Sequence, residues 1–222
     1  MVDRLPYWLA VPEGWHRIPL DIATSGSDPA GTAVRDLVRS VGRELPPHQA
    51  TRARSIVRAA LDSAVAQARG AGGVDLYIPL DLLAGAPVPL GIVVSEPVPP
   101  AGSGTPEDVL LQFAARGESR ATEIGGVLAV RRVSDEKPRT GPEGIDVPPT
   151  RRISYLAAVP GTSRWLSVTA SIARFDMPDG ERVSAAVEEL FDAIASTLRF
   201  RRYARDHGVD HGSSVRKAEP RL

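Results

Sequence analysis

Residues 153–172 contain the pattern that decides the fold: ISYLAAV at 153–159, PGTSR at 160–164 and WLSVTASI at 165–172. In the last segment, apolar side chains alternate with the hydroxyl side chains of Ser167, Thr169 and Ser171. Alternation with a period of two is typical of a strand whose two faces meet different surroundings. Because a Pro-Gly turn joins the two runs, the sequence predicts an antiparallel hairpin. We expect its apolar side chains to face the core and its hydroxyls to face outward.

Helices and further strands are predicted on both sides of this hairpin. Apolar residues recur every three or four positions between Val183 and Leu198, which is the strongest helical stripe in the chain. A second tight stripe, which includes Ile56 and Ala60, predicts a helix packed closely on a sheet. The expected helices span about 33–45, 47–69, 105–114 and 179–198, and the expected extended segments span about 7–20, 74–80, 87–94 and 127–133. The sequence therefore predicts an α+β fold in which helices cover a mostly antiparallel sheet.

The length of 222 residues suits one large domain with or without tails. We expect a single domain over residues 1–200. Apolar residues become rare after that point, and residues 199–222 contain seven basic and three acidic side chains. The sequence therefore predicts a disordered basic tail over residues 201–222.

Composition excludes several classes of function. The chain has no cysteine, which removes disulfides, thiolate catalysis and cysteine-based metal sites. Basic and acidic residues both number 27, so no overall field attracts nucleic acid, and we expect no sequence-specific nucleic-acid binding. No apolar stretch reaches the roughly 18 residues that a membrane-spanning helix needs, and no signal peptide is recognisable at the start. A cytoplasmic protein is expected, and the scarcity of lysine among the bases suggests an actinobacterial, GC-rich genome.

Three segments together resemble one family. They are LAVPEGW at 9–15, GGVLAVRR at 125–132 and a closing block over 155–200 that ends in ELFDAIASTLRF at 189–200. In this order they resemble the PsbP-like superfamily. The resemblance implies an α/β/α sandwich on an antiparallel sheet. It also implies an accessory or partner-binding role without catalysis, and it transfers no binding residue, because the matching motifs are structural.

The sequence contains no recognisable catalytic constellation. His16 could act as a catalytic base only with a nucleophile, and the sequence contains no nucleophile-elbow motif. The glycines at 102 and 104 are not followed by the Lys-Ser/Thr of a phosphate-binding loop. The segment DHGVDH at 206–211 has zinc or nickel ligand types, but it lies in the predicted tail, where no scaffold would hold the ligands. We therefore predict no catalytic, cofactor-binding or metal-binding residue.

Two groups of residues are candidates for binding a partner. If the strands that contain Arg131-Arg132 and Arg151-Arg152 pair antiparallel, at least one arginine from each lies on the same side. Such a pair could bind carboxylate or phosphate, whereas the alternative is a solvated sheet face. The tryptophans Trp8 and Trp15 form the second group, because aromatic residues are enriched at interface hot spots, although they also fill cores.

These observations predict a non-catalytic accessory or adaptor protein that binds a protein partner, possibly an acidic one. The alternative is a small-ligand or lipid-binding module with a cleft between sheet and helix. An exposed patch rimmed with arginine would favour the adaptor, and an apolar cavity would favour the ligand-binding module.

Overall fold

The structure is a computed structural model. It describes residues 7–21, 26–43, 45–79, 82–83, 86–87, 90–99, 102, 104–115, 118–140, 146–174 and 179–200. The predicted tail at 201–222, including the segment 206–211, lies outside the described residues.

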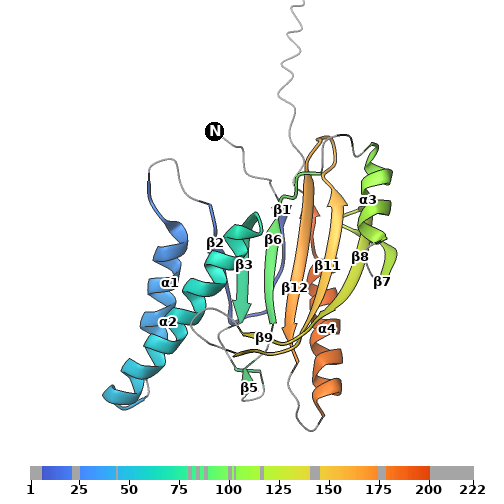
Figure 1. Ribbon diagram of the computed structural model, residues 1–222. Helices are drawn as coiled ribbons and strands as arrows, with labels where there is room; N and C mark the ends of the chain where they lie inside the picture. The colour runs from blue at the N-terminus through green and yellow to red at the C-terminus, as the bar shows by residue number, and fades with distance from the viewer. Residues whose placement is uncertain are drawn as a thin grey trace, which may run out of the picture.

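A seven-stranded sheet forms the centre of the molecule, and all of its neighbouring strands pair antiparallel. Figure 1 shows the sheet from one face, with its first and last strands at opposite edges. In spatial order the strands are β2 (Trp15–Pro19), β3 (Gly73–Pro79), β6 (Leu90–Ser95), β12 (Trp165–Ala173), β11 (Thr150–Ala158), β8 (Val127–Glu136) and β7 (Glu118–Ile124). The predicted hairpin is confirmed as β11 and β12, which lie at the centre of the sheet.

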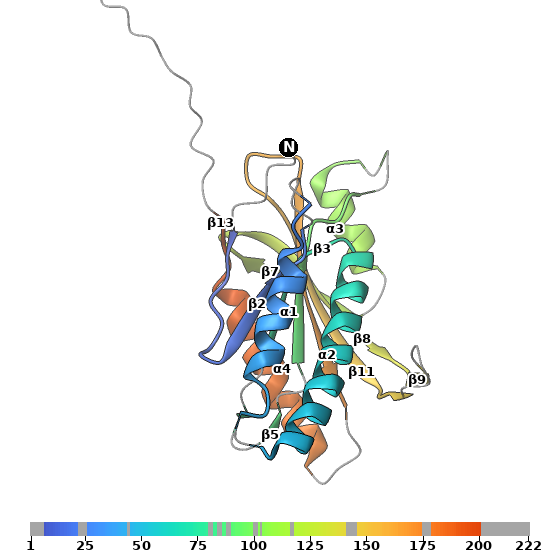
Figure 2. The same ribbon diagram turned by 90° about the vertical axis from the view of Figure 1, so that its left-hand side faces the viewer.

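Four described helices cover the two faces of the sheet: α1 (Pro29–Ser40), α2 (Pro47–Gly70), α3 (Pro106–Ala114) and α4 (Gly180–Ser196). The first three pack on one face, and α4 packs on the other, as Figures 1 and 2 show together. The α+β class with an antiparallel sheet is therefore confirmed, with helical layers on both sides of the sheet.

The main core lies between α4 and the sheet. Alternate residues of β12 point into it, including Leu166, Val168 and Ile172, all fully buried. Phe191 of α4 is also fully buried there, with its ring centroid 5.7 Å from that of Tyr155 on β11. The stripe predicted for the closing helix is thus the side of α4 that meets the sheet.

The opposite face has two separate apolar clusters instead of one. The first lies between α1, α2 and the strands β2 and β3, and it includes Val34, Leu61 and Leu76. The second lies under α3, where Leu110 packs with Leu156 and other residues of the neighbouring strands. The middle strands of the sheet lie between these two clusters.

The ends of α3 and α2 differ in how well the sequence predicts them. Thr105 and Asp108 form the predicted start of α3, because each side chain bonds to the backbone N–H of the other and closes a capping box. The stripe predicted for α2 is wrong at its start, since Ile56 and Ala60 are exposed. Their neighbours Val57 and Leu61 pack on the cluster beneath α1 and α2, so Ile56 and Ala60 lie on the outer side of the helix.

Several short strands in the described chain pair with one another outside the seven-stranded sheet. The strand β1 (Tyr7–Trp8) pairs antiparallel with β13 (Arg199–Phe200), which brings the two ends of the described chain together. Four further two-residue strands in the described ranges form two antiparallel pairs, β4 (Leu82–Leu83) with β5 (Ala86–Pro87) and β9 (Arg139–Thr140) with β10 (Asp146–Val147). Within the described ranges, no helix has the length and apolar character needed to cross a membrane.

Candidate binding site

A groove lies on the sheet face between α2 and α3. Figure 1 shows β6, β12 and β11 uncovered by helices in this region. The groove has a volume of about 390 Å³ and is bounded by residues of α2, α3 and five strands. We call it the α2–α3 groove; its lining residues are Ala64, Gln67, Ala68, Ala71, Leu76, Ile78, Gly91, Val93, Ser95, Phe113, Arg132, Arg152, Ser154, Ser167, Thr169 and Ser171.

Hydroxyl side chains form the floor of the α2–α3 groove. The outward-facing residues of β12 predicted from the sequence, Ser167, Thr169 and Ser171, all line it. Register places Thr169 opposite Ser154, and the Thr169 hydroxyl donates to the Ser154 oxygen over 3.0 Å. The hydroxyls of Ser167 and Thr169 lie 3.3 Å apart and share a further hydrogen bond. Because a hydroxyl both donates and accepts, this floor can pair with either kind of polar group on a ligand.

Two arginines stand beside this floor. Register pairs Arg132 with Ser154 and Arg152 with Ser134, so both arginines lie on the groove face of neighbouring strands, offset by two positions. The guanidinium carbon of Arg132 lies 4.1 Å from the centroid of the Phe113 ring, which is a cation–π contact. The sequence prediction that one arginine from each pair shares a side is confirmed.

Arg152 is held at one end and lacks a partner at another nitrogen. Its Nη1 lies 2.8 Å from Glu136, which fixes the guanidinium. Its Nε is buried and has no hydrogen-bond partner among the described residues. A buried N–H without an acceptor is costly.

The charge of the groove is positive. Its lining includes Arg132 and Arg152, and none of the described lining residues is Asp or Glu. Glu136 pairs with Arg152 but is not among the lining residues. The site therefore complements an anion.

The other two predicted arginines, Arg131 and Arg151, bind acidic side chains of α4. Arg131 is buried on the α4 face, where its Nε lies 3.0 Å from Asp192 and its Nη2 lies 2.5 Å from Glu188. Arg151 joins the same network through a 3.0 Å bond from its Nε to Glu188. These contacts join α4 to the sheet, and the expectation that Arg131 and Arg151 bind a partner stays a prediction.

The pKa values in this network follow from its contacts. Burial lowers the pKa of Arg131, but hydrogen bonds to Asp192 and Glu188 outweigh it, so the pKa lies above the usual arginine value. Burial, followed by the hydrogen bond to Asp192, raises the pKa of Tyr155 to about 12. Tyr155 donates to Asp192 over 2.7 Å, so it remains a neutral donor at ordinary pH. The contacts between β8, β11 and α4 account for both pKa shifts, so the shifts do not indicate a substrate site.

The two N-terminal tryptophans do not line the groove. Trp8 lies on β1 and is 52% exposed, whereas Trp15 is partly buried against the main core. The tryptophan nearest the groove is Trp165, which is only 6% exposed and lines an adjoining pocket. Its position in the alternating strand 165–172 was the signal that could have identified it.

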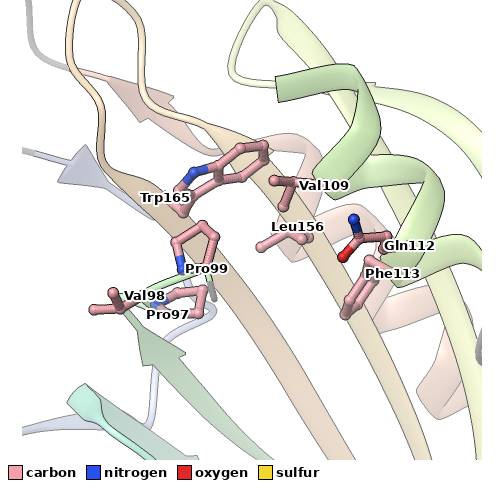
Figure 3. Close-up of a pocket in the computed structure, with 8 residues that line it drawn as sticks. All are labelled: Pro97, Val98, Pro99, Val109, Gln112, Phe113, Leu156 and Trp165. Carbon is pink, nitrogen blue, oxygen red and sulfur yellow. The ribbon is translucent and has the colours of Figure 1, made fainter. Parts of the chain in front are cut away.

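This adjoining pocket is apolar and has a volume of about 160 Å³. Figure 3 shows Trp165 and the segment 97–99 on one side, α3 residues on the other, and Leu156 between them. Phe113 belongs to both the apolar pocket and the α2–α3 groove, so the two hollows are neighbours. We call this hollow the Trp165 pocket.

A buried ionic cluster on the α4 side of the sheet is a second place where polar groups gather. Asp75 of β3 is fully buried, and Arg17 binds both of its carboxylate oxygens at 2.9 Å. Tyr7 also donates to this carboxylate, and its hydroxyl lies 3.2 Å from that of Tyr77. Burial, and then the charge of Asp75, raises the pKa of Tyr7. Because both carboxylate oxygens already have donors, this cluster is a structural clamp on the N-terminal strand.

Metal ligands are not grouped in the part of the chain that the structure describes, where no three His, Asp or Glu residues lie close enough to hold an ion.

No protein-family model matches the sequence, and no curated protein shows significant similarity to it. The functional proposal therefore depends on the geometry of the groove.

Proposed function

We propose that the chain is a non-catalytic accessory or adaptor protein that binds an acidic segment of a protein partner in the α2–α3 groove. One observation supports this above all others: a hydroxyl floor with two arginines beside it and, among the described lining residues, no acid. Arginine pairs well with carboxylates because its planar N–H groups match the two carboxylate oxygens.

The composition of the floor also supports binding of a polar partner in this groove. A sheet face that packs against a helix is normally apolar, as the α4 side of β12 is. The groove side of the same strand has Ser167, Thr169 and Ser171 instead. This face is therefore suited to a polar partner that can leave, and not to a permanent core contact.

A small-ligand module is the second candidate, and one observation favours it. The groove volume of about 390 Å³ falls within the range of small-molecule sites, about 300–1,000 Å³. Such sites are mostly apolar, however, and the floor here is built from hydroxyls. The hydroxyl floor and the two arginines beside it fit an acidic protein segment better.

The proposal predicts that charge reversal in the groove abolishes capture of the partner. We expect Arg132→Glu/Arg152→Glu to reduce partner recovery from a native lysate about tenfold or more, since lost charge pairs at an interface cost a few kcal/mol. Recovery by the unaltered protein should also fall as salt rises, because exposed charges are screened over about 8–10 Å. The measurement is affinity capture with quantitative mass spectrometry.

A matched control makes this experiment decisive. Arg39→Glu/Arg182→Glu gives the same change in net charge at two exposed sites outside the groove, on α1 and α4. It should leave capture unchanged, and thermal unfolding should show that both variants fold. Equal, salt-insensitive recovery of the same proteins by both variants would refute the groove as the binding site.

A further inference from the structure

We infer that the bound segment is extended and bipartite, with an acidic side chain beside Arg152 and an apolar side chain, about six residues away, in the Trp165 pocket. This inference rests on the proposed function and specifies the partner chemistry of the same site. Three features of the structure support it: the length of the hollow, its polarity from end to end, and the open space above Gly91.

The hollow follows one face of β12. Ser171, Thr169 and Ser167 line the α2–α3 groove, and Trp165, next on the same face, lines the Trp165 pocket. From Ser171 to Trp165 is six residues, which spans about 20 Å at about 3.3 Å per strand residue. A third hollow of about 380 Å³ shares Pro99, Val109 and Trp165 with the Trp165 pocket and extends the path further. A path of this length matches an extended segment of about six residues better than a compact ligand.

Arg152 lies at one end of this path, whereas Arg132 lies further along it, stacked on Phe113 of the Trp165 pocket. Register places Arg152 opposite Ser171, and it places Arg132 and Thr169 on either side of Ser154. At this end the buried Nε of Arg152 has no acceptor among the residues described. A carboxylate placed here would pair with the exposed part of the Arg152 guanidinium, while Glu136 continues to hold Nη1.

The other end of the path is apolar. Leu156 lies opposite Ser167, and Trp165 follows at the end of the hairpin. Val98, between two prolines, lines the Trp165 pocket with 90% of its surface exposed. An apolar side chain in this pocket would cover Val98 and contact Phe113 and Val109, which removes apolar surface from water.

The Arg152 end of the path has room for a backbone. A Cβ added to Gly91, which lies opposite Ser171, would meet no atom within 4 Å. The neighbouring hydroxyls can accept from peptide N–H groups and donate to peptide carbonyls. Gly91 also offers a test that leaves every charge in place, because Gly91→Leu would fill the groove without clashing with the backbone, and larger residues suit a strand.

The experiment uses fluorescein-labelled synthetic peptides and the full chain, with binding followed by fluorescence anisotropy. The main probe has eight residues, with two glutamates at one end, phenylalanine six positions further and serine between; its reversed sequence covers the opposite direction. Control peptides replace the glutamates with glutamine, replace phenylalanine with alanine, or place glutamate and phenylalanine side by side. Free acetate and inorganic phosphate test the anion alone.

We expect one direction of the spaced peptide to bind at least about tenfold more tightly than each of the three control peptides. Gly91→Leu and Arg152→Gln should each weaken it about tenfold or more, Val98→Ser should weaken it several-fold, and Arg182→Glu should have no effect. If neither direction of the spaced peptide binds better than the controls, the inference is overturned, while partner capture that depends on Arg132 and Arg152 would still support the proposed function. If acetate or phosphate binds with the same dependence on Arg152 and no peptide binds, the small-ligand candidate replaces both.

Discussion

Phe191→Ala is expected to lower the free energy of unfolding by about 3–5 kcal/mol, because the substitution removes a fully buried ring from the core beneath α4. The ring lies against Tyr155, and a cavity there would loosen the contact between α4 and the centre of the sheet. Urea unfolding followed by circular dichroism measures the change.

The control for this prediction lies on the same helix. Val183 is 43% exposed, so Val183→Ala should change stability by no more than about 0.5 kcal/mol. If Phe191→Ala were as mild as Val183→Ala, α4 would not be packed on the sheet as described.

Asp75→Ala is expected to cost about 3 kcal/mol or more. It leaves the guanidinium of Arg17 and the hydroxyl of Tyr7 without their shared acceptor in a buried setting. Because Arg17 is almost half exposed, water can compensate part of its loss, so the effect should lie at the low end of the range for broken buried ion pairs, about 3–5 kcal/mol. Thermal or urea unfolding measures this effect.

An exposed carboxylate provides the control that separates the effect of burial from the effect of losing a charge. Asp36 pairs with Arg39 on the surface of α1, where both side chains are exposed. Asp36→Ala should therefore cost no more than about 1 kcal/mol. Similar losses for the two substitutions would contradict the role of Asp75 as a clamp between β3 and the N-terminal strand.

Much of the fold could be predicted from local periodicity. The strand pair β11–β12 and the helix α4 have strict periods of two and of three to four residues, and both are confirmed. The edge strand β7 (Glu118–Ile124) was not predicted, because its residues are almost all exposed and show no apolar alternation. Ile56 and Ala60 were misjudged for the opposite reason: the pattern is apolar, but only the neighbouring Val57 and Leu61 face the core, and Ile56 and Ala60 lie on the outer side of α2.

The site was predictable only in part. Alternation placed Ser167, Thr169 and Ser171 on the outward face and one arginine of each pair on a shared side. It could not show that no helix covers those hydroxyls, or that Glu188 and Asp192 of α4 bind Arg131 while Arg132 faces the groove. Those facts depend on contacts between elements far apart in the sequence. The resemblance to PsbP-like proteins implies the layered architecture that the structure has, and membership in that family stays a prediction.

The most direct test of the central claim is a map of the partner's footprint by amide chemical shifts. An isotope-labelled sample of the chain would be titrated with the acidic partner segment recovered by capture. The account predicts that the largest shifts fall on β6, β11 and β12, at Gly91, Arg152 and Thr169, and on α2 near Gln67. Shifts confined to β1 around Trp8, or to the outer surface of α4, would contradict it.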